Sequence, residues 1–121
     1  MDQTTLYGIP NCDSMKKARA WLSAQGIDYH FHNYKQAGIT EDTLRAWVAQ
    51  VGWEVLLNRR GMLWRKVPPE AKATINEANA IQLMLATPSM IKRPVLQHAT
   101  ALHVGFTPAE YARIFSATTH V

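Results

Sequence analysis

The sequence predicts an α/β domain with one core and an inserted helical segment, and three observations support this fold class. The chain has 121 residues, 47% of them hydrophobic, which is enough for one core and leaves no length for a second. Short β-prone runs lie near both ends of the chain, whereas the middle has helical periodicity. Turn-forming residues separate these runs, so the order of the elements can be taken from the sequence.

The first third of the chain predicts a β-α-β unit. Thr5-Leu6-Tyr7 is β-prone and ends at the turn cluster Gly8-Ile9-Pro10-Asn11. A helix is expected next, and its buried face should consist of Met15, Ala18 and Leu22. Residues 27–34 alternate apolar or aromatic side chains with polar ones, which is typical of a half-buried strand. Two strands joined by one helix predict a parallel pair.

The middle of the chain predicts several helices. Thr40 with two acidic residues after it favours a helix start, and the buried face of that helix should be Leu44, Trp47, Val48 and Val51. Val55-Leu56-Leu57 predicts a short helical turn, and residues 58–66 an irregular basic segment. Residues 76–86 predict a further helix, whose inward side chains should be Ala78, Ile81 and Leu85. We therefore expect a helical insertion over about residues 40–88.

The last third predicts a hairpin and a final helix. Residues 94–98 and 101–105 are β-prone runs separated by Ala99-Thr100, which is hairpin spacing. Thr107 to Glu110 predicts a capping box with proline at the first helical position. The buried stripe of this helix should be Tyr111, Ile114 and Phe115. The order β-α-β, helical insertion, β-β-α is that of the thioredoxin fold, and we expect residues 1–121 to form one such domain.

Composition narrows the class of function and the location. The formal charge of +4 favours anionic ligands but is too small to indicate nucleic-acid binding. The first five residues show no signal-peptide pattern, and the apolar stretches are too short to span a bilayer. The single cysteine excludes an intrachain disulfide and is typical of a reducing compartment. We expect a cytoplasmic monomer with no membrane or nucleic-acid partner.

Cys12 is the first candidate catalytic residue, because it lies between the first predicted strand and the first predicted helix. Free backbone N–H groups and the helix dipole favour an anion there, and Lys16 adds positive charge if it turns back toward the loop. We therefore expect the thiol pKa to lie below its ordinary value of about 8.5, although Asp13 opposes the shift. The alternative is an inert, buried cysteine.

Arginines are the second group of candidates. Arg59, Arg60, Arg65 and Lys66 crowd one segment, and Lys92-Arg93 precedes Pro94. Guanidinium groups bind oxyanions and carboxylates through paired hydrogen bonds, as a substrate near a thiolate would require. Taken alone, each cluster is better explained by a solvated surface, and only the combination with Cys12 favours a binding site. His30 and His32 alternate on a predicted strand without a cysteine or carboxylate nearby, so we expect surface histidines and no metal site.

These residues resemble the arsenate-reductase-like family that also contains the Spx regulators, and most closely its short YffB-like branch. The segments that carry the resemblance are residues 6–18, 56–61, 64–66, 88–95 and 104–106. The resemblance implies a thioredoxin-like fold with a helical insertion, and Cys12 as the nucleophile. It also implies that Arg60 and Arg93 bind the anion, with Arg59 as the second choice for Arg60. Pro94 is implied to be a cis-proline beside the site.

The chain departs from the family pattern at three positions. Gly8 stands where the reductases place a histidine, and their third arginine has no counterpart in Leu102-His103-Val104-Gly105. Met15 stands where the Spx regulators usually place a second cysteine, so an internal disulfide switch is impossible.

Together these observations predict a thiol-dependent reductase with no bound cofactor. The Cys12 thiolate would attack a disulfide sulfur or an oxyanion such as arsenate, and an external thiol would release the product. Glutathione is the expected co-substrate, with glutaredoxin as a possible partner. The alternative is a non-enzymatic regulatory or protein-binding module like the Spx regulators, in which Cys12 is a vestige.

Overall fold

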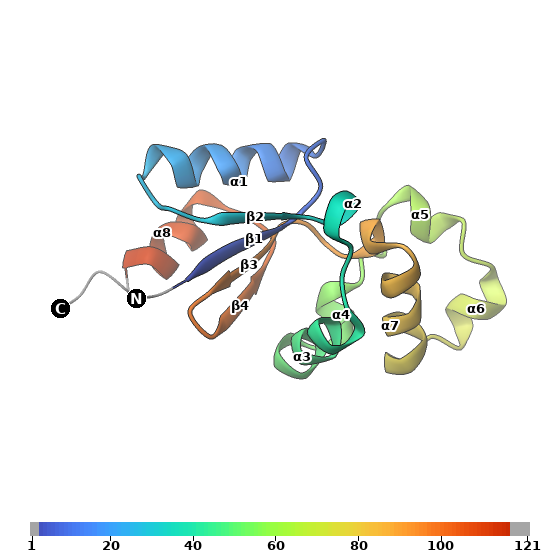
Figure 1. Ribbon diagram of the computed structural model, residues 1–121. Coiled ribbons are helices and arrows are strands. Elements are labelled where there is room, and N and C mark those ends of the chain that lie inside the picture. The colour runs from blue at the N-terminus through green and yellow to red at the C-terminus, as the bar shows by residue number, and fades with distance from the viewer. Residues whose placement is uncertain (1–2, 117–121) are drawn as a thin grey trace. The chain divides into compact units, whose positions relative to one another are not determined.

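The computed structural model describes residues 3–116, which fall into two compact units (Figure 1). Residues 3–32 and 93–116 form the first unit, and Asn33–Lys92 forms the second. Residues 1–2 and 117–121 lie outside the described part of the chain. None of the helices within residues 3–116 has the length and apolar character needed to cross a membrane.

The first unit contains a four-stranded sheet in the order β2-β1-β3-β4. Its elements are β1 (Thr4–Gly8), α1 (Asp13–Ala24), β2 (His30–Asn33), β3 (Val95–His98), β4 (Ala101–Val104) and α8 (Pro108–Ser116). β3 runs antiparallel to both β1 and β4, whereas β1 and β2 point the same way (Figure 1). The mixed sheet and the β-α-β, β-β-α order confirm the predicted fold class.

α1 buries the face that its periodicity predicts. Met15, Ala18 and Leu22 have no exposed surface and pack with Leu6 and Leu96 of the sheet in one core cluster. The helix ends as the chain turns through Gly26, whose φ of +69° favours glycine. The core therefore holds α1 against the sheet, which fixes the position of its first turn.

The second predicted strand is shorter in the structure than in the sequence interpretation. β2 covers only His30–Asn33, and Tyr34 already begins the short helix α2 (Tyr34–Ala37). The side-chain Oδ1 of Asn33 accepts a hydrogen bond from the Lys35 N–H at 2.9 Å, which caps α2 and ends the strand. The predicted strand over residues 27–34 was therefore wrong at both ends, because residues 27–29 precede β2 and Tyr34 follows it.

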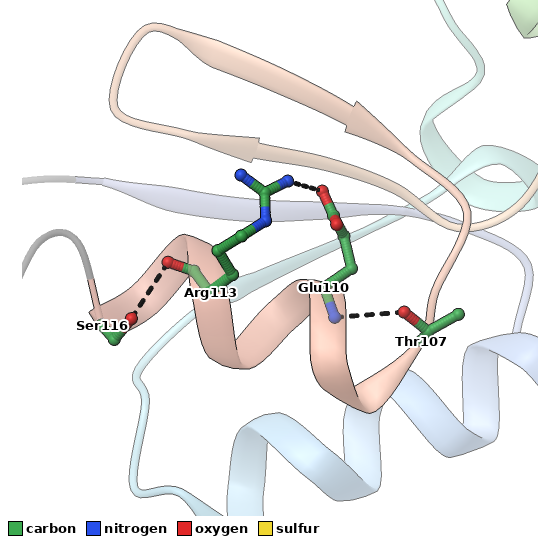
Figure 2. Close-up of polar contacts among 4 residues, drawn as sticks. All are labelled: Thr107, Glu110, Arg113 and Ser116. Carbon is green, nitrogen blue, oxygen red and sulfur yellow. Dashed lines mark hydrogen bonds and ion pairs between the residues drawn. The ribbon is translucent and has the colours of Figure 1, made fainter.

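The hairpin and the last helix form where they are predicted. Ala99 has a φ of 55°, the positive value that the first residue of a two-residue hairpin turn requires. Thr107 Oγ1 accepts the Glu110 N–H at 3.1 Å (Figure 2). The reciprocal half of the predicted capping box is replaced, because the Glu110 carboxylate pairs with Arg113 (Figure 2). Tyr111, Ile114 and Phe115 are buried as predicted.

The second unit is helical. Its elements are α2, α3 (Glu41–Val51), α4 (Trp53–Leu56), α5 (Met62–Arg65), α6 (Pro69–Ala73), α7 (Glu77–Ala86) and the 3-10 helix η1 (Pro88–Met90). α3 has the predicted cap, since Thr40 Oγ1 accepts the Thr43 N–H at 3.2 Å. It buries Leu44, Trp47 and Val48, whereas Val51 stays partly exposed. An antiparallel bridge between Leu57 and Ile91 joins the residue after α4 to the residue after η1.

Val51 was predicted to be buried, and two further predictions for this unit were also wrong. α7 buries Ala80, Ile81 and Met84, whereas Ala78 is exposed and Leu85 is only half-buried. α7 is apolar around most of its circumference, so periodicity alone does not select the buried face; contacts with α3, α4 and η1 select it. The segment at residues 58–66 is not wholly irregular, because it contains α5.

Candidate active site

Cys12 is the N-cap residue of α1. It has extended backbone angles, φ −141° and ψ 131°, and its carbonyl accepts the first helical hydrogen bond from the Lys16 N–H at 2.9 Å. Its side chain is half-buried and packs against the edge of the core cluster of the first unit. The sulfur is therefore held at the end of the helix where backbone N–H groups lack a helical partner.

Hydrogen bonds make Cys12 more acidic than an ordinary thiol. Burial by itself raises the pKa of Cys12, but the nearby backbone N–H groups of Met15 and Ser14 favour the thiolate and lower the pKa. A hydrogen bond from the Arg93 side chain, and the charge of Arg93, lower the pKa further. The net result is a pKa below the ordinary value, which favours the thiolate.

Strand pairing brings Arg93 to Cys12. β3 pairs antiparallel with β1 in a register that sets Val95 opposite Tyr7, so the residues before β3 lie beside those that follow β1. The Arg93–Pro94 peptide bond is cis, as the family resemblance implied. The Gly105 N–H donates to the Pro94 carbonyl at 2.8 Å. Three loops of the first unit therefore meet here: the loop before α1, the loop before β3 and the loop after β4.

Gly8 and Met15 are coupled, which the sequence interpretation missed. A Cβ atom added at Gly8 would lie 2.4 Å from Met15 Sδ and 2.8 Å from Met15 Cε. Met15 has no exposed surface, so its side chain fills the space where a side chain at position 8 would start. The two departures from the family pattern at these positions are thus one packing arrangement beneath Cys12.

The remaining predicted site residues are exposed. Lys16 lies on α1, and the cation that donates to the sulfur is Arg93. Arg59 and Arg60 belong to the second unit. The Arg59 guanidinium lies 5.6 Å from the Trp53 ring centroid, and the Arg60 N–H donates to Asn58 Oδ1 at 3.1 Å. Roles for Lys16, Arg59 and Arg60 in anion binding stay predictions.

The predicted strand histidines have different surroundings. His30 is exposed, and the His32 ring lies against Tyr7 with centroids 4.8 Å apart. Within residues 3–116 there is no group of three or more histidine, cysteine, aspartate or glutamate side chains that could hold a metal ion.

The fold and the site define a thioredoxin-like protein with a single activated cysteine at a helix N-terminus. A family model described as the ArsC family matches residues 7–114, and the chain belongs to this family. A solved structure of a YFFB protein is 51% identical, with a TM-score of 0.88 over 92% of this chain and 97% of that one.

An arsenate reductase (ArsC) related protein from Brucella melitensis is also 51% identical, with a TM-score of 0.78 over 93% of this chain and 94% of that chain. The global transcriptional regulator Spx of Streptococcus pyogenes serotype M3 is 26% identical over 114 residues, which cover 93% of this chain and 84% of that protein. The chain is thus similar both to reductase-related proteins and to a regulator.

Proposed function

We propose that the protein is a thiol-dependent reductase in which the Cys12 thiolate is the nucleophile. The observation that carries this proposal is the position of Cys12 at the N-cap of α1, where the Ser14 and Met15 N–H groups and Arg93 lower its pKa. The thiolate is the reactive form in thiol–disulfide exchange and in attack on other electrophiles.

With a disulfide substrate, the Cys12 thiolate attacks one sulfur atom. A new disulfide bond forms to Cys12, the substrate S–S bond breaks, and the other half leaves as a thiolate that takes a proton from solvent. Because the chain has one cysteine, an external thiol must regenerate it. Two glutathione molecules give up two electrons and two protons in total and become one glutathione disulfide.

With arsenate, the same thiolate would attack the arsenic atom and displace an oxygen as water. Two glutathione molecules would then supply two electrons, so that arsenate and two thiols give arsenite, water and glutathione disulfide. Arg93 is positioned to hold an anion beside the sulfur, since guanidinium has five donors and one contact already goes to Cys12. We assign a second anion-binding role to Arg60, with Arg59 as its substitute, and propose glutaredoxin as the partner that recycles the mixed disulfide.

A coupled assay tests this function. Arsenate and a small glutathione mixed disulfide are each offered with glutathione and glutaredoxin, and glutathione oxidation is followed for the wild type and Cys12→Ser. We expect turnover of at least one substrate by the wild type and none by the variant. Turnover of neither substrate, or equal turnover by Cys12→Ser, would show that the proposal is wrong.

A second candidate is a non-enzymatic module that binds another protein, and the similarity to the Spx regulator favours it. In that case Cys12→Ser would keep partner binding, and neither substrate would be turned over. We also propose that the protein is a cytoplasmic monomer, because a single unpaired thiol stays reduced in the cytoplasm and glutathione is available there.

A further inference from the structure

An apolar groove of about 570 Å³ lies on the first unit. Three α1 residues and three consecutive residues after β4 line it: Lys17, Ala20, Trp21, Phe106, Thr107 and Pro108. Ala20 is exposed, and Trp21 and Phe106 are half-buried. Trp21 and Phe106 both pack against the core cluster, so the walls of the groove are held in place by the core.

Both walls of the groove are connected through the chain to the loops that surround Cys12. Lys17 lies five residues after Cys12, which is about 7.5 Å along the axis of an α-helix. On the other wall, Phe106 follows Gly105, whose N–H donates to the carbonyl of cis-Pro94 at 2.8 Å. Arg93, the residue before Pro94, donates to the Cys12 sulfur. A molecule attached to Cys12 through a disulfide can therefore lie along the groove.

The apolar lining and its single positive charge indicate which kind of molecule the groove binds. Among the described lining residues, Lys17 carries the only charge, and the nearby Glu110 carboxylate is engaged by Arg113 (Figure 2). An occupant with an apolar side chain and an acidic group fits this surface. Glutathione has carboxylates but no apolar side chain, so it would leave the aromatic and proline walls exposed to water.

We propose that the groove binds a polypeptide whose disulfide sulfur is attacked by Cys12, an inference that rests on the function proposed above. An aromatic or aliphatic residue beside the substrate cysteine lies between Trp21 and Phe106, and an acidic residue lies at Lys17. In the reaction, the bond between Cys12 and the substrate sulfur forms, the substrate S–S bond breaks, and the other half leaves as a thiolate. The substrate class is therefore a protein disulfide, and glutathione serves as the reductant.

The test measures how fast Cys12 reacts with short peptide disulfides. Each peptide carries one cysteine as a mixed disulfide with thionitrobenzoate, whose release reports the rate constant. The peptides form pairs with phenylalanine or alanine beside the cysteine, on either side, and each contains one glutamate. For at least one pair we expect the phenylalanine peptide to react about tenfold faster, which equals about 1.4 kcal/mol, through partial burial of the ring.

Two alanines of α1 give a matched pair of variants. Ala20→Gln fills the groove from an exposed helix position, and Ala24→Gln makes the same change at an exposed position outside the lining. We expect Ala20→Gln to abolish the preference for phenylalanine and Ala24→Gln to keep it. Lys17→Glu should slow the glutamate peptides relative to counterparts with glutamine. A phenylalanine preference below about twofold, which is under 0.5 kcal/mol, or one that survives Ala20→Gln, would overturn the inference.

The mixed disulfide of glutathione with thionitrobenzoate separates this inference from the proposed function. If that compound reacts with Cys12 and the peptides show no preference, only the groove assignment is wrong. If Cys12 reacts with none of the disulfides, the proposed reductase function is wrong and the groove assignment fails with it.

Discussion

Replacing Gly8 by alanine tests the packing beneath Cys12. The new Cβ would lie 2.4 Å from Met15 Sδ, so the sulfur must retreat by about 1 Å to reach an ordinary contact distance. Met15 has no exposed surface, and a close-packed core offers little space for this movement. Overpacking of this kind costs about 1–3 kcal/mol. Because glycine-to-alanine also restricts the unfolded chain, by about 0.4–1 kcal/mol, we expect a net loss of about 1–2 kcal/mol.

Thermal and urea unfolding of four proteins would measure this loss: the wild type, Gly8→Ala, Met15→Ala and the double variant. Met15→Ala alone should cost about 2–5 kcal/mol through the cavity it leaves. Gly8→Ala should cost nothing further in that background, because its Cβ then points into the cavity. The resulting coupling free energy should have a magnitude of about 1–2 kcal/mol, equal to the cost of Gly8→Ala in the wild type.

Gly61→Ala is the matched control, because it adds the same methyl group at a half-exposed position. Its Cβ would lie 3.1 Å from Asn58 Nδ2, so the Asn58 amide, whose Oδ1 accepts the Arg60 N–H, needs to shift by only a few tenths of an ångström. We expect unchanged or slightly higher stability there. Gly8→Ala should also slow alkylation of Cys12 near neutral pH, because displacing Met15 weakens the N–H donor that stabilises the thiolate. Wild-type stability together with wild-type Cys12 reactivity in Gly8→Ala would refute the packing argument.

Three further predictions concern the first unit. The alkylation rate of Cys12 should rise with pH, with a midpoint below the ordinary thiol pKa of about 8.5, because the surroundings of Cys12 favour the thiolate. Arg93→Ala should raise that midpoint. A midpoint that Arg93→Ala does not move would contradict the role of Arg93. Ala99→Gly should stabilise the hairpin by about 0.5–1 kcal/mol in urea unfolding, because it relieves a positive φ, whereas no gain would show that the turn is unstrained. Thr107→Ala should cost about 1 kcal/mol by removing the cap of α8, whereas Glu110→Gln should cost much less, since its ion pair with Arg113 is exposed.

The sequence predicts those parts of the fold where local chemistry and packing agree. The buried face of α1 and the cap of α8 follow from side-chain spacing and from Thr107. The face of α7 could not be predicted in this way, because an apolar helix can bury several faces and the surrounding helices decide which one. The early end of β2 depends on Asn33, whose side chain caps α2; this competing turn signal was overlooked.

The candidate site, too, could be predicted from the sequence only where it depends on local chain features. Cys12 and the free N–H groups after it could be placed from the sequence, because both belong to one strand-to-helix connection. The contact from Arg93 depends on antiparallel pairing between β1 and β3, which joins residues far apart in the chain. The sequence offered Arg93 as one of several candidate arginines, and only the family resemblance singled it out and pointed to the cis bond at Pro94. The steric relation between Gly8 and Met15 could not be predicted from the sequence, because it depends on the distance between the backbone at the end of β1 and the backbone of α1.

The steric relation between Gly8 and Met15 changes how the two departures from the family pattern at these positions are understood. Taken separately, Gly8 lacks a polar side chain near the nucleophile, and Met15 lacks a second thiol. In the structure, the Met15 side chain fills the space at position 8, while the Met15 N–H helps to lower the pKa of Cys12. The thiolate is thus stabilised by main-chain donors and one arginine, and these do not depend on a side chain at position 8. A cysteine activated in this way can form a mixed disulfide but cannot close an internal one, so its chemistry must be completed by a second molecule.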